Sequence, residues 1–276
     1  MKPVQIQHIY IGDQSPLAFI AGPCVIESRD HTLRMAEEIK KLSEETGAPL
    51  VFKASYDKAN RSSIESYRGP GIEDGAEVLR EVKERFGLPI LTDVHEPWHV
   101  GILADIVNVM QVPAFLCRQT DLIVEIAESG CVVNVKKGQF LAPWDIEQVI
   151  NKITSAGNEH ILLTERGASF GYNNLVSDMR AIPIMKQFGF PVVFDATHSA
   201  QLPGGLGHAT GGMREFITPV ARAAIAAGAN AVFMEVHDDV NNAKSDSATQ
   251  WPLEKARDLI DQLQKVYEVT RNMEDL

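Results

Sequence analysis

Residues that often bind transition metals follow apolar segments near both ends of the chain. Cys24 follows an early segment, His198 and Glu235 follow late ones, and Asp246 comes after Glu235 in the sequence. A thiolate, an imidazole and two carboxylates suit a borderline divalent ion such as Zn²⁺, Fe²⁺ or Mn²⁺ better than Mg²⁺. Taken singly, Cys24 is also explained as a small buried apolar residue, and Asp246 as a solvated loop carboxylate. The four residues therefore predict a metal site only if the fold joins the two ends of the chain.

Five cationic side chains form a second group of interest, and they are Lys53, Lys58, Arg61, Lys136 and Arg166. Phosphate and carboxylate recognition needs cations and N–H donors at fixed positions, and Arg offers a bidentate fork. The segment 53–63 is dense in such donors but lacks the glycines of a nucleotide-binding P-loop. Asp plus Glu number 37 against 26 Lys plus Arg, a formal net charge of −11. This balance disfavours nucleic acid and anionic membranes as partners, so we expect a local anion site instead.

Eight short apolar segments must position these residues, and they span residues 17–24, 50–55, 89–95, 106–114, 131–137, 160–166, 191–198 and 229–237. Such near-continuous apolar runs are typical of parallel strands buried on both faces. Helical periodicity lies between them, as in residues 33–42, and glycines such as Gly47 and Gly87 end the helical segments. The pattern predicts a single (β/α)₈ TIM barrel domain over residues 1–276. A doubly wound sheet is the alternative, which the missing G-x-G-x-x-G after the first strand disfavours.

The N-terminal segment alternates apolar and polar residues before the first barrel strand. This alternation, over residues 3–12, predicts a small β-hairpin. We expect an N-terminal extension of residues 1–15 whose hairpin caps the barrel floor.

Each predicted strand becomes polar at its C-terminal end, where barrel enzymes place their active sites. The first, seventh and eighth strands are consecutive in a closed barrel, so Cys24, His198 and Glu235 would meet there. The loop after the eighth strand would bring Asp246 to the same place. The cations of the second, fifth and sixth strands would converge on the same mouth. The sequence therefore predicts a catalytic site that combines a metal with an anion-binding cradle.

The cysteines and the N-terminus indicate a cellular compartment. Cys24, Cys117 and Cys131 form no disulfide framework, which favours a reducing environment. The N-terminus lacks the apolar core of a signal peptide, and no apolar stretch is long enough to span a bilayer. We expect a cytoplasmic protein.

The sequence resembles the 3-deoxy-D-manno-octulosonate 8-phosphate synthases along nearly its whole length. The segments that carry the resemblance are 22–28, 53–63, 68–71, 113–121, 134–137, 166–172 and 195–198. The resemblance implies a (β/α)₈ barrel that condenses phosphoenolpyruvate, arabinose 5-phosphate and water, for the inner core of lipopolysaccharide. It also implies a homotetramer with Arg118 near a subunit boundary. The metal-independent branch of the family carries Asn where Cys24 stands, so this chain is similar to the metal-dependent branch.

The resemblance also implies roles for individual residues. The metal ligands would be Cys24, His198, Glu235 and Asp246, and the catalytic group would consist of Cys24, Asp93, Lys136 and His198. The substrate-binding residues would be Lys53, Ser55, Lys58, Asn60, Arg61, Ser62, Gln111, Pro113, Ala114, Arg118, Lys136 and Arg166. Among them, Asn60, Arg61 and Ser62 would hold the sugar phosphate. The metal would orient the aldehyde or position the attacking water, and the sequence does not choose between these roles.

Two other functions remain open at this point. A heptulosonate-phosphate synthase would share the barrel and phosphoenolpyruvate but use erythrose 4-phosphate. The segment 58–63 favours the five-carbon sugar, because the rival family usually has a Lys-Pro-Arg-Thr type segment there. A non-catalytic barrel that binds phosphometabolites would explain the cations but not a complete metal set. The glycine-rich segment 201–214 is either a mobile lid or an ordinary surface loop.

Overall fold

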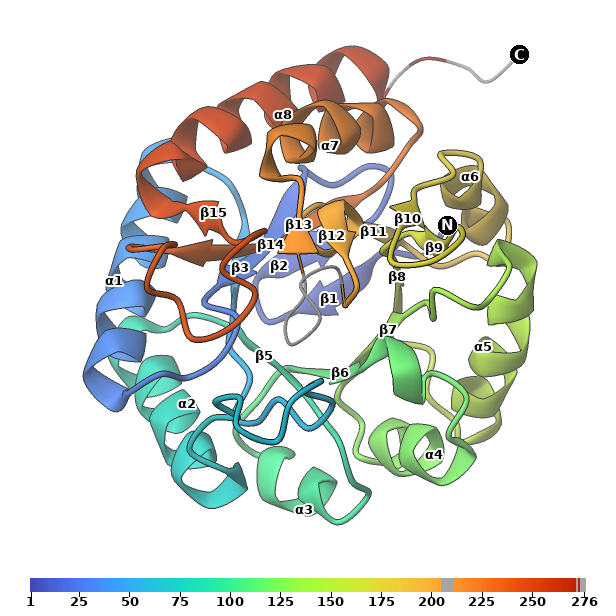
Figure 1. Cartoon of the computed structure of the whole chain (residues 1–276). Coiled ribbons are helices and arrows are strands. Elements are labelled where there is room, and N and C mark those ends of the chain that lie inside the picture. The colour runs from blue at the N-terminus through green and yellow to red at the C-terminus, as the bar shows by residue number, and fades with distance from the viewer. Residues whose placement is uncertain (205–210, 272, 274–276) are drawn as a thin grey trace.

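The computed structural model describes residues 1–204, 211–271 and 273, and it is a closed barrel of parallel strands (Figure 1). The barrel strands are β3 (Ala18–Gly22), β4 (Leu50–Lys53), β5 (Ile90–Asp93), β6 (Val109–Val112), β7 (Val132–Lys136), β8 (Ile161–Glu165), β11 (Val192–Asp195) and β14 (Ala231–His237). Each pairs in parallel with its neighbours, and β14 pairs with both β11 and β3. This closure confirms the predicted (β/α)₈ barrel and excludes an open doubly wound sheet.

Helices form a ring around the barrel (Figure 1). They are α1 (Arg29–Thr46), α2 (Ile72–Phe86), α3 (His99–Leu103), α4 (Thr120–Glu128), α5 (Ile146–Ser155), α6 (Ala181–Lys186), α7 (Ile217–Ala226) and α8 (Ala256–Thr270). The first helix illustrates why they form. Its N-cap, Ser28, accepts a hydrogen bond from the His31 N–H, and Gly47 ends it in the left-handed region at φ 66°. Among the described residues, no helix is long and apolar enough to cross a membrane.

The loops between the barrel strands and helices contain shorter elements. Two-residue strands pair as β9 (Ala168–Ser169) with β10 (Leu175–Val176) and β12 (Gln201–Leu202) with β13 (Gly211–Gly212), while β15 (Trp251–Pro252) pairs with β14. Turns of 3₁₀ helix are Ala114–Leu116, Pro143–Asp145, His198–Ala200, Arg214–Phe216 and Leu253–Lys255.

A hairpin plugs the N-terminal end of the barrel. Strands β1 (Val4–Ile6) and β2 (Ile9–Ile11) pair antiparallel, and their alternate residues are buried. Those residues share one apolar cluster with inward-facing barrel residues such as Ile20, Val51 and Leu91. The predicted hairpin at the barrel floor is therefore confirmed.

A close backbone approach shapes the opposite end of the barrel. Gly22 ends β3 at φ 153°, and a Cβ atom there would lie 2.1 Å from the carbonyl oxygen of Lys53. Only glycine tolerates this contact, because any side chain would push β3 and β4 apart. The end of β4, with Lys53, is thereby held against the turn that carries Cys24.

Candidate active site

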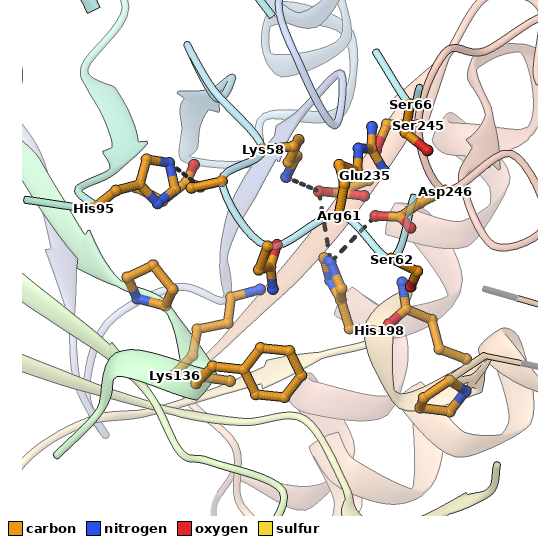
Figure 2. Close-up of a pocket in the computed structure, with 18 of the residues that line it drawn as sticks. Lys58, Arg61, Ser62, Ser66, His95, Lys136, His198, Glu235, Ser245 and Asp246 are labelled. Atoms are coloured by element: carbon orange, nitrogen blue, oxygen red, sulfur yellow. Dashed lines mark ion pairs between the residues drawn. The ribbon is translucent and has the colours of Figure 1, made fainter. Parts of the chain in front are cut away.

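A cavity of about 510 Å³ opens at the C-terminal ends of the barrel strands. Most of the predicted site residues line it, and these are Lys53, Lys58, Asn60, Arg61, Ser62, Asp93, Gln111, Pro113, Ala114, Lys136, Arg166, His198, Glu235 and Asp246. Figure 2 shows that the labelled side chains come from several strands and loops and surround one space. The volume is typical of a site for small molecules rather than for a macromolecular ligand.

The predicted metal ligands come together despite their separation in the sequence. Cys24, Glu235 and Asp246 each offer one atom, and these atoms lie within 4.8 Å of one another. His198 joins them from the other side (Figure 2), with Nε2 3.7 Å from Glu235 Oε1 and 3.8 Å from Asp246 Oδ2. The neighbouring strands β11, β14 and β3 bring three of the residues together, and the loop after β14 brings Asp246.

The chemistry of this group fits a divalent cation. The Oε2 atom of Glu235 is buried and has no hydrogen-bond partner among the described residues, which is costly for a carboxylate. Asp246 is held at φ 47°, a strained conformation for a residue other than glycine. A soft thiolate with an imidazole and two carboxylates suits Zn²⁺, Fe²⁺ or Mn²⁺.

Burial and neighbouring charges determine which of the predicted metal ligands carry a proton. Burial raises the pKa of the Cys24 thiol well above its usual value, and Glu235 adds to the effect. The neutral thiol lies 2.9 Å from Ser245 Oγ and 3.2 Å from Asp246 Oδ2, so it has acceptors for its proton. Burial would raise the pKa of Glu235, but Lys53 and His198 outweigh it and hold that pKa well below its usual range. A bound cation would lower the pKa of the Cys24 thiol and so favour its thiolate form.

Asp195 lies between the predicted metal ligands and the predicted anion-binding cations, and it was not identified from the sequence. Its carboxylate contacts Lys136 Nζ, and its Oδ2 lies 2.8 Å from His198 Nδ1. Burial would raise the pKa of Asp195, but His198 and Lys136 outweigh it and keep that pKa below its ordinary value. The carboxylate pairs with the imidazole at Nδ1, without hydrogen-bond geometry, and leaves Nε2 for a metal. Its position at the end of β11, three residues before His198, was the available signal.

Lys136 lies deep in the cavity against an aromatic ring. Its Nζ lies 3.4 Å from the centroid of the Phe233 ring, and the residue is almost fully buried. Burial lowers the pKa of Lys136 to about 8, although the Asp195 carboxylate opposes the shift. A lysine with this pKa carries a proton at neutral pH and releases it readily, as a general acid must.

Asp93 lies at the end of β5, where its carboxylate accepts a hydrogen bond from the Ser55 hydroxyl. Burial would raise the pKa of Asp93, but Lys58 and His95 outweigh it and lower that pKa to about 2. Asp93 is therefore an anion throughout the physiological range. Such a group orients donors and cations at the cavity wall rather than exchanging protons.

The cations lie at two depths. Lys53 Nζ donates to the Cys24 carbonyl oxygen at 2.7 Å and to Glu235 Oε1 at 2.8 Å, so it is tied to the metal-ligand group. Arg166 is also buried, with Nη2 donating to Gln201 Oε1 at 3.0 Å and Nη1 without a partner among the described residues. Arg61 lies nearer the rim, where Nε donates to the Tyr67 carbonyl oxygen at 3.0 Å.

Three predicted residues do not line the cavity. Ser55 and Cys24 are fully buried beneath it, where they contact Asp93 and Asp246. Arg118 is exposed outside it, and its carbonyl oxygen accepts a hydrogen bond from Lys152 Nζ. The centre of the predicted lid, residues 205–210, lies outside the described residues.

A second group of histidines and carboxylates lies beside the first. Glu27, His31 and His237 could also offer ligand atoms to one ion. Hydrogen bonds already occupy both nitrogens of His237, because Nδ1 accepts from the Asp239 N–H at 2.9 Å and Nε2 lies 3.2 Å from Glu27 Oε1. His31 Nε2 is 3.0 Å from Asp238 Oδ1. We therefore interpret this group as a hydrogen-bonded junction.

Comparison with known proteins gives a consistent result. The sequence model of the DAHP synthetase I family matches residues 1–272. The 2-dehydro-3-deoxyphosphooctonate aldolase of Geobacter metallireducens is 54% identical over 265 residues, which cover 96% of this chain and 97% of that protein. The proteins of the same name from Desulfosudis oleivorans and Protochlamydia amoebophila are 56% and 51% identical. They cover 93% and 98% of this chain, and the match covers 92% and 98% of their own lengths.

Proposed function

The chain belongs to the DAHP synthetase I family, and we propose that it condenses phosphoenolpyruvate with arabinose 5-phosphate and water. The products are 3-deoxy-D-manno-octulosonate 8-phosphate, a precursor for lipopolysaccharide, and inorganic phosphate. Relatives that share more than half of their residues with this chain are named for this enzyme. The observation that carries the proposal is the cavity in which buried cations lie beside His198, Glu235 and Asp246, with the Cys24 thiol buried directly beneath them.

The deeper cations bind phosphoenolpyruvate in this proposal. Lys53, Lys58, Lys136 and Arg166 would surround its carboxylate and phosphate, with Gln111 and the Pro113–Ala114 backbone beside them. Asn60, Arg61 and Ser62, on the loop after β4, would hold the phosphate of the sugar. The cations reduce the repulsion between two multiply charged substrates and hold them in attack geometry. Such positioning contributes on the order of 7–11 kcal/mol in the best intramolecular models.

The reaction forms one carbon–carbon bond and one carbon–oxygen bond, and it breaks the carbon–oxygen bond to the phosphate. The third carbon of phosphoenolpyruvate attacks the aldehyde carbon of the sugar, and the aldehyde oxygen takes up a proton. Water adds to the second carbon of phosphoenolpyruvate, where positive charge develops, and loses a proton. The resulting tetrahedral intermediate releases phosphate by cleavage of its carbon–oxygen bond, while the hydroxyl group from water loses its proton and becomes the carbonyl group of the product.

Lys136 is the proton donor that we assign to the departing phosphate. It is buried in the cavity, it is protonated at neutral pH, and Asp195 holds its ammonium group in place. Asp93 would orient the reacting groups without exchanging protons. Full turnover in a Lys136→Met variant would refute the assignment to the lysine.

Cys24, His198, Glu235 and Asp246 would hold the divalent ion, of the Zn²⁺, Fe²⁺ or Mn²⁺ type. When bound, the ion supplies Lewis-acid catalysis to an oxygen of the substrates. Asp195 would pair with the Nδ1 side of His198, and Lys53 and Lys58 would offset the negative charge of Glu235 in the metal-free protein.

The assembly and location of the enzyme belong to the same proposal. We infer a homotetramer with Arg118 at a subunit boundary. Phe140 and Trp144 are more than half exposed in the single chain and are candidates for burial at such a boundary. The cytoplasm suits the enzyme, because Cys24 must stay reduced and all three cysteines are free. Light scattering of the purified protein tests the tetramer.

The first experiment is an assay of phosphate release from phosphoenolpyruvate. It is run with arabinose 5-phosphate and with erythrose 4-phosphate, before and after treatment with a chelator. We expect release with the five-carbon sugar alone, loss of release after chelation, and recovery on addition of a divalent metal.

Other outcomes would change the assignment. The matching family has the name of a DAHP synthetase, so the second candidate is heptulosonate-phosphate synthesis, and preference for erythrose 4-phosphate in the assay would support it. Release that resists chelation would keep the enzyme and refute the catalytic metal. Tight binding of phosphoenolpyruvate in calorimetry, with no release with either sugar, would favour a non-catalytic barrel that binds phosphometabolites.

A further inference from the structure

Glu27 contacts both ends of the segment that carries a predicted metal ligand. Its Oε1 atom accepts a hydrogen bond from the Lys244 N–H at 2.8 Å and lies 3.2 Å from His237 Nε2. His237 is the last residue of β14, two residues after Glu235, and Lys244 comes two residues before Asp246. One carboxylate oxygen therefore ties together the two sides of the loop between β14 and β15.

The same residue lies on the turn that presents Cys24. Glu27 follows Cys24 by three residues, between β3 and α1, and its side chain is 12% exposed. Its contacts thus join the segments that carry Cys24, Glu235 and Asp246. These are the three residues whose ligand atoms lie within 4.8 Å of one another.

Backbone and aromatic contacts reinforce this junction. Lys244 Nζ lies 3.4 Å from the Glu27 carbonyl oxygen and 4.5 Å from the centroid of the Tyr67 ring. The Tyr67 hydroxyl donates to that same carbonyl oxygen at 3.2 Å. Because His237 Nδ1 accepts from the Asp239 N–H, its Nε2 carries the proton in the neutral ring and donates it to Glu27.

The loop needs such a restraint. Residues 238–250 form no strand or helix, so their backbone entropy must be offset by specific contacts. Asp246 is also held in the left-handed region, which it would leave if the loop were free.

We propose that Glu27 is a positioning residue for the metal site, whose Oε1 holds the Asp246 loop against Cys24 and Glu235 before the ion binds. The inference rests on the proposed metal site and goes beyond it, because Glu27 would contact neither the ion nor a substrate. An ion would then meet ligands that are already assembled. Residues that hydrogen-bond a metal ligand directly typically contribute 10–100-fold in affinity, and Glu27, which acts through the loop, should contribute at the lower end of that range.

Titration of the metal-free protein with Co²⁺ tests the proposal. Absorption from thiolate-to-cobalt charge transfer reports the Cys24 ligand directly, without any measurement of activity. We expect Glu27→Ala to weaken Co²⁺ binding by about tenfold, the lower end of the range for groups that support metal ligands. Glu27→Gln should stay within about threefold of the unmodified protein, because its amide oxygen accepts the same two hydrogen bonds.

A matched control separates positioning from general stability. Glu81→Gln alters another carboxylate, which accepts from Arg29 and Arg85 on the outer helices, and it should leave Co²⁺ binding unchanged. The metal-free Glu27→Gln and Glu81→Gln variants should keep the Tm of the unmodified protein, and Glu27→Ala should lower it only by the cost of two lost hydrogen bonds. If Glu27→Ala does not fold, Glu27→Met fills the same space without an acceptor, and the same loss of affinity is expected.

Three results would contradict the proposal in distinguishable ways. Unchanged Co²⁺ affinity in Glu27→Ala, or in Glu27→Met where the alanine variant does not fold, would refute the role of Glu27 alone. Equal losses in the Gln and Ala variants would also refute it, because the acceptor oxygen would not be the cause. Absence of the thiolate band in the unmodified protein would refute the metal site itself and this inference with it.

Discussion

The two ends of the barrel interior differ sharply although the same strands build both. At the floor, inward-facing residues are apolar and pack against the N-terminal hairpin. Two residues further along the same strands, where side chains face the same way, the interior is charged. The pairs that show the change are Val51 and Lys53, Leu91 and Asp93, and Val193 and Asp195.

This difference separates stability from chemistry along each strand. Apolar burial at the floor stabilises the fold by roughly 25 cal/mol per Å². The buried ions at the mouth cost desolvation energy, which their partners only partly offset. Substitutions at the floor should therefore change stability, and substitutions at the mouth should change activity.

The largest expected effect comes from the metal-ligand group. His198→Ala should lose the bound ion together with several kcal/mol of transition-state stabilisation, on the order of a thousandfold in kcat. Metal analysis and the phosphate assay check this, with Cys24→Ser expected to behave alike. Cys24→Asn is the subtler comparison, because the resemblance places asparagine there in metal-independent relatives. Metal content and activity that survive His198→Ala would count against the site.

Lys136→Met should lower kcat by about a hundredfold or more, the usual contribution of a general acid. The methionine keeps the packing on Phe233 but cannot donate a proton. Single-turnover kinetics measure the step, and circular dichroism should show an intact fold. A Lys136→Met variant that fails to fold would contradict the expectation that substitutions at the mouth change activity rather than stability.

Leu91→Ala tests the opposite end of the strand that carries Asp93. Leu91 is fully buried, so the cavity left behind should cost about 2–5 kcal/mol in the free energy of unfolding. Because the site lies beyond it, kcat of the folded fraction should stay within about threefold. Denaturant titration gives the stability, and a large fall in kcat at low temperature would contradict the division of roles.

The smallest expected effect is the change of kcat with pH. Burial lowers the pKa of Lys136 from 10.5 to about 8, so the protonated donor declines as pH rises above 8, and kcat should fall with it. Lys136→Arg, which stays charged, should show no such alkaline limb. The free energy of unfolding should instead rise with pH over this range. Between pH 8 and 10.5 the unfolded state binds more protons, so the Lys136 contribution to stability rises with pH.

Much of the fold was predictable because the apolar runs are distinct. Parallel strands buried on both faces leave a continuous signal, and each predicted segment contains a barrel strand. Ligands from distant segments could be grouped because closure makes the first and eighth strands neighbours. What escaped prediction depends on side-chain register. That Asp195 serves both Lys136 and His198, or that Ser245 reaches Cys24, follows from positions that no sequence spacing encodes.

The hairpin at the floor has an electrostatic consequence. An apolar plug keeps water out from below, so the charges at the mouth are screened by solvent on one side only. Their field is thereby focused outward through the opening, as in clefts with walls of low dielectric constant. An acidic protein can then attract anionic substrates locally while it repels them elsewhere. The association rate should accordingly fall as ionic strength rises and the Debye length shrinks below the depth of the mouth.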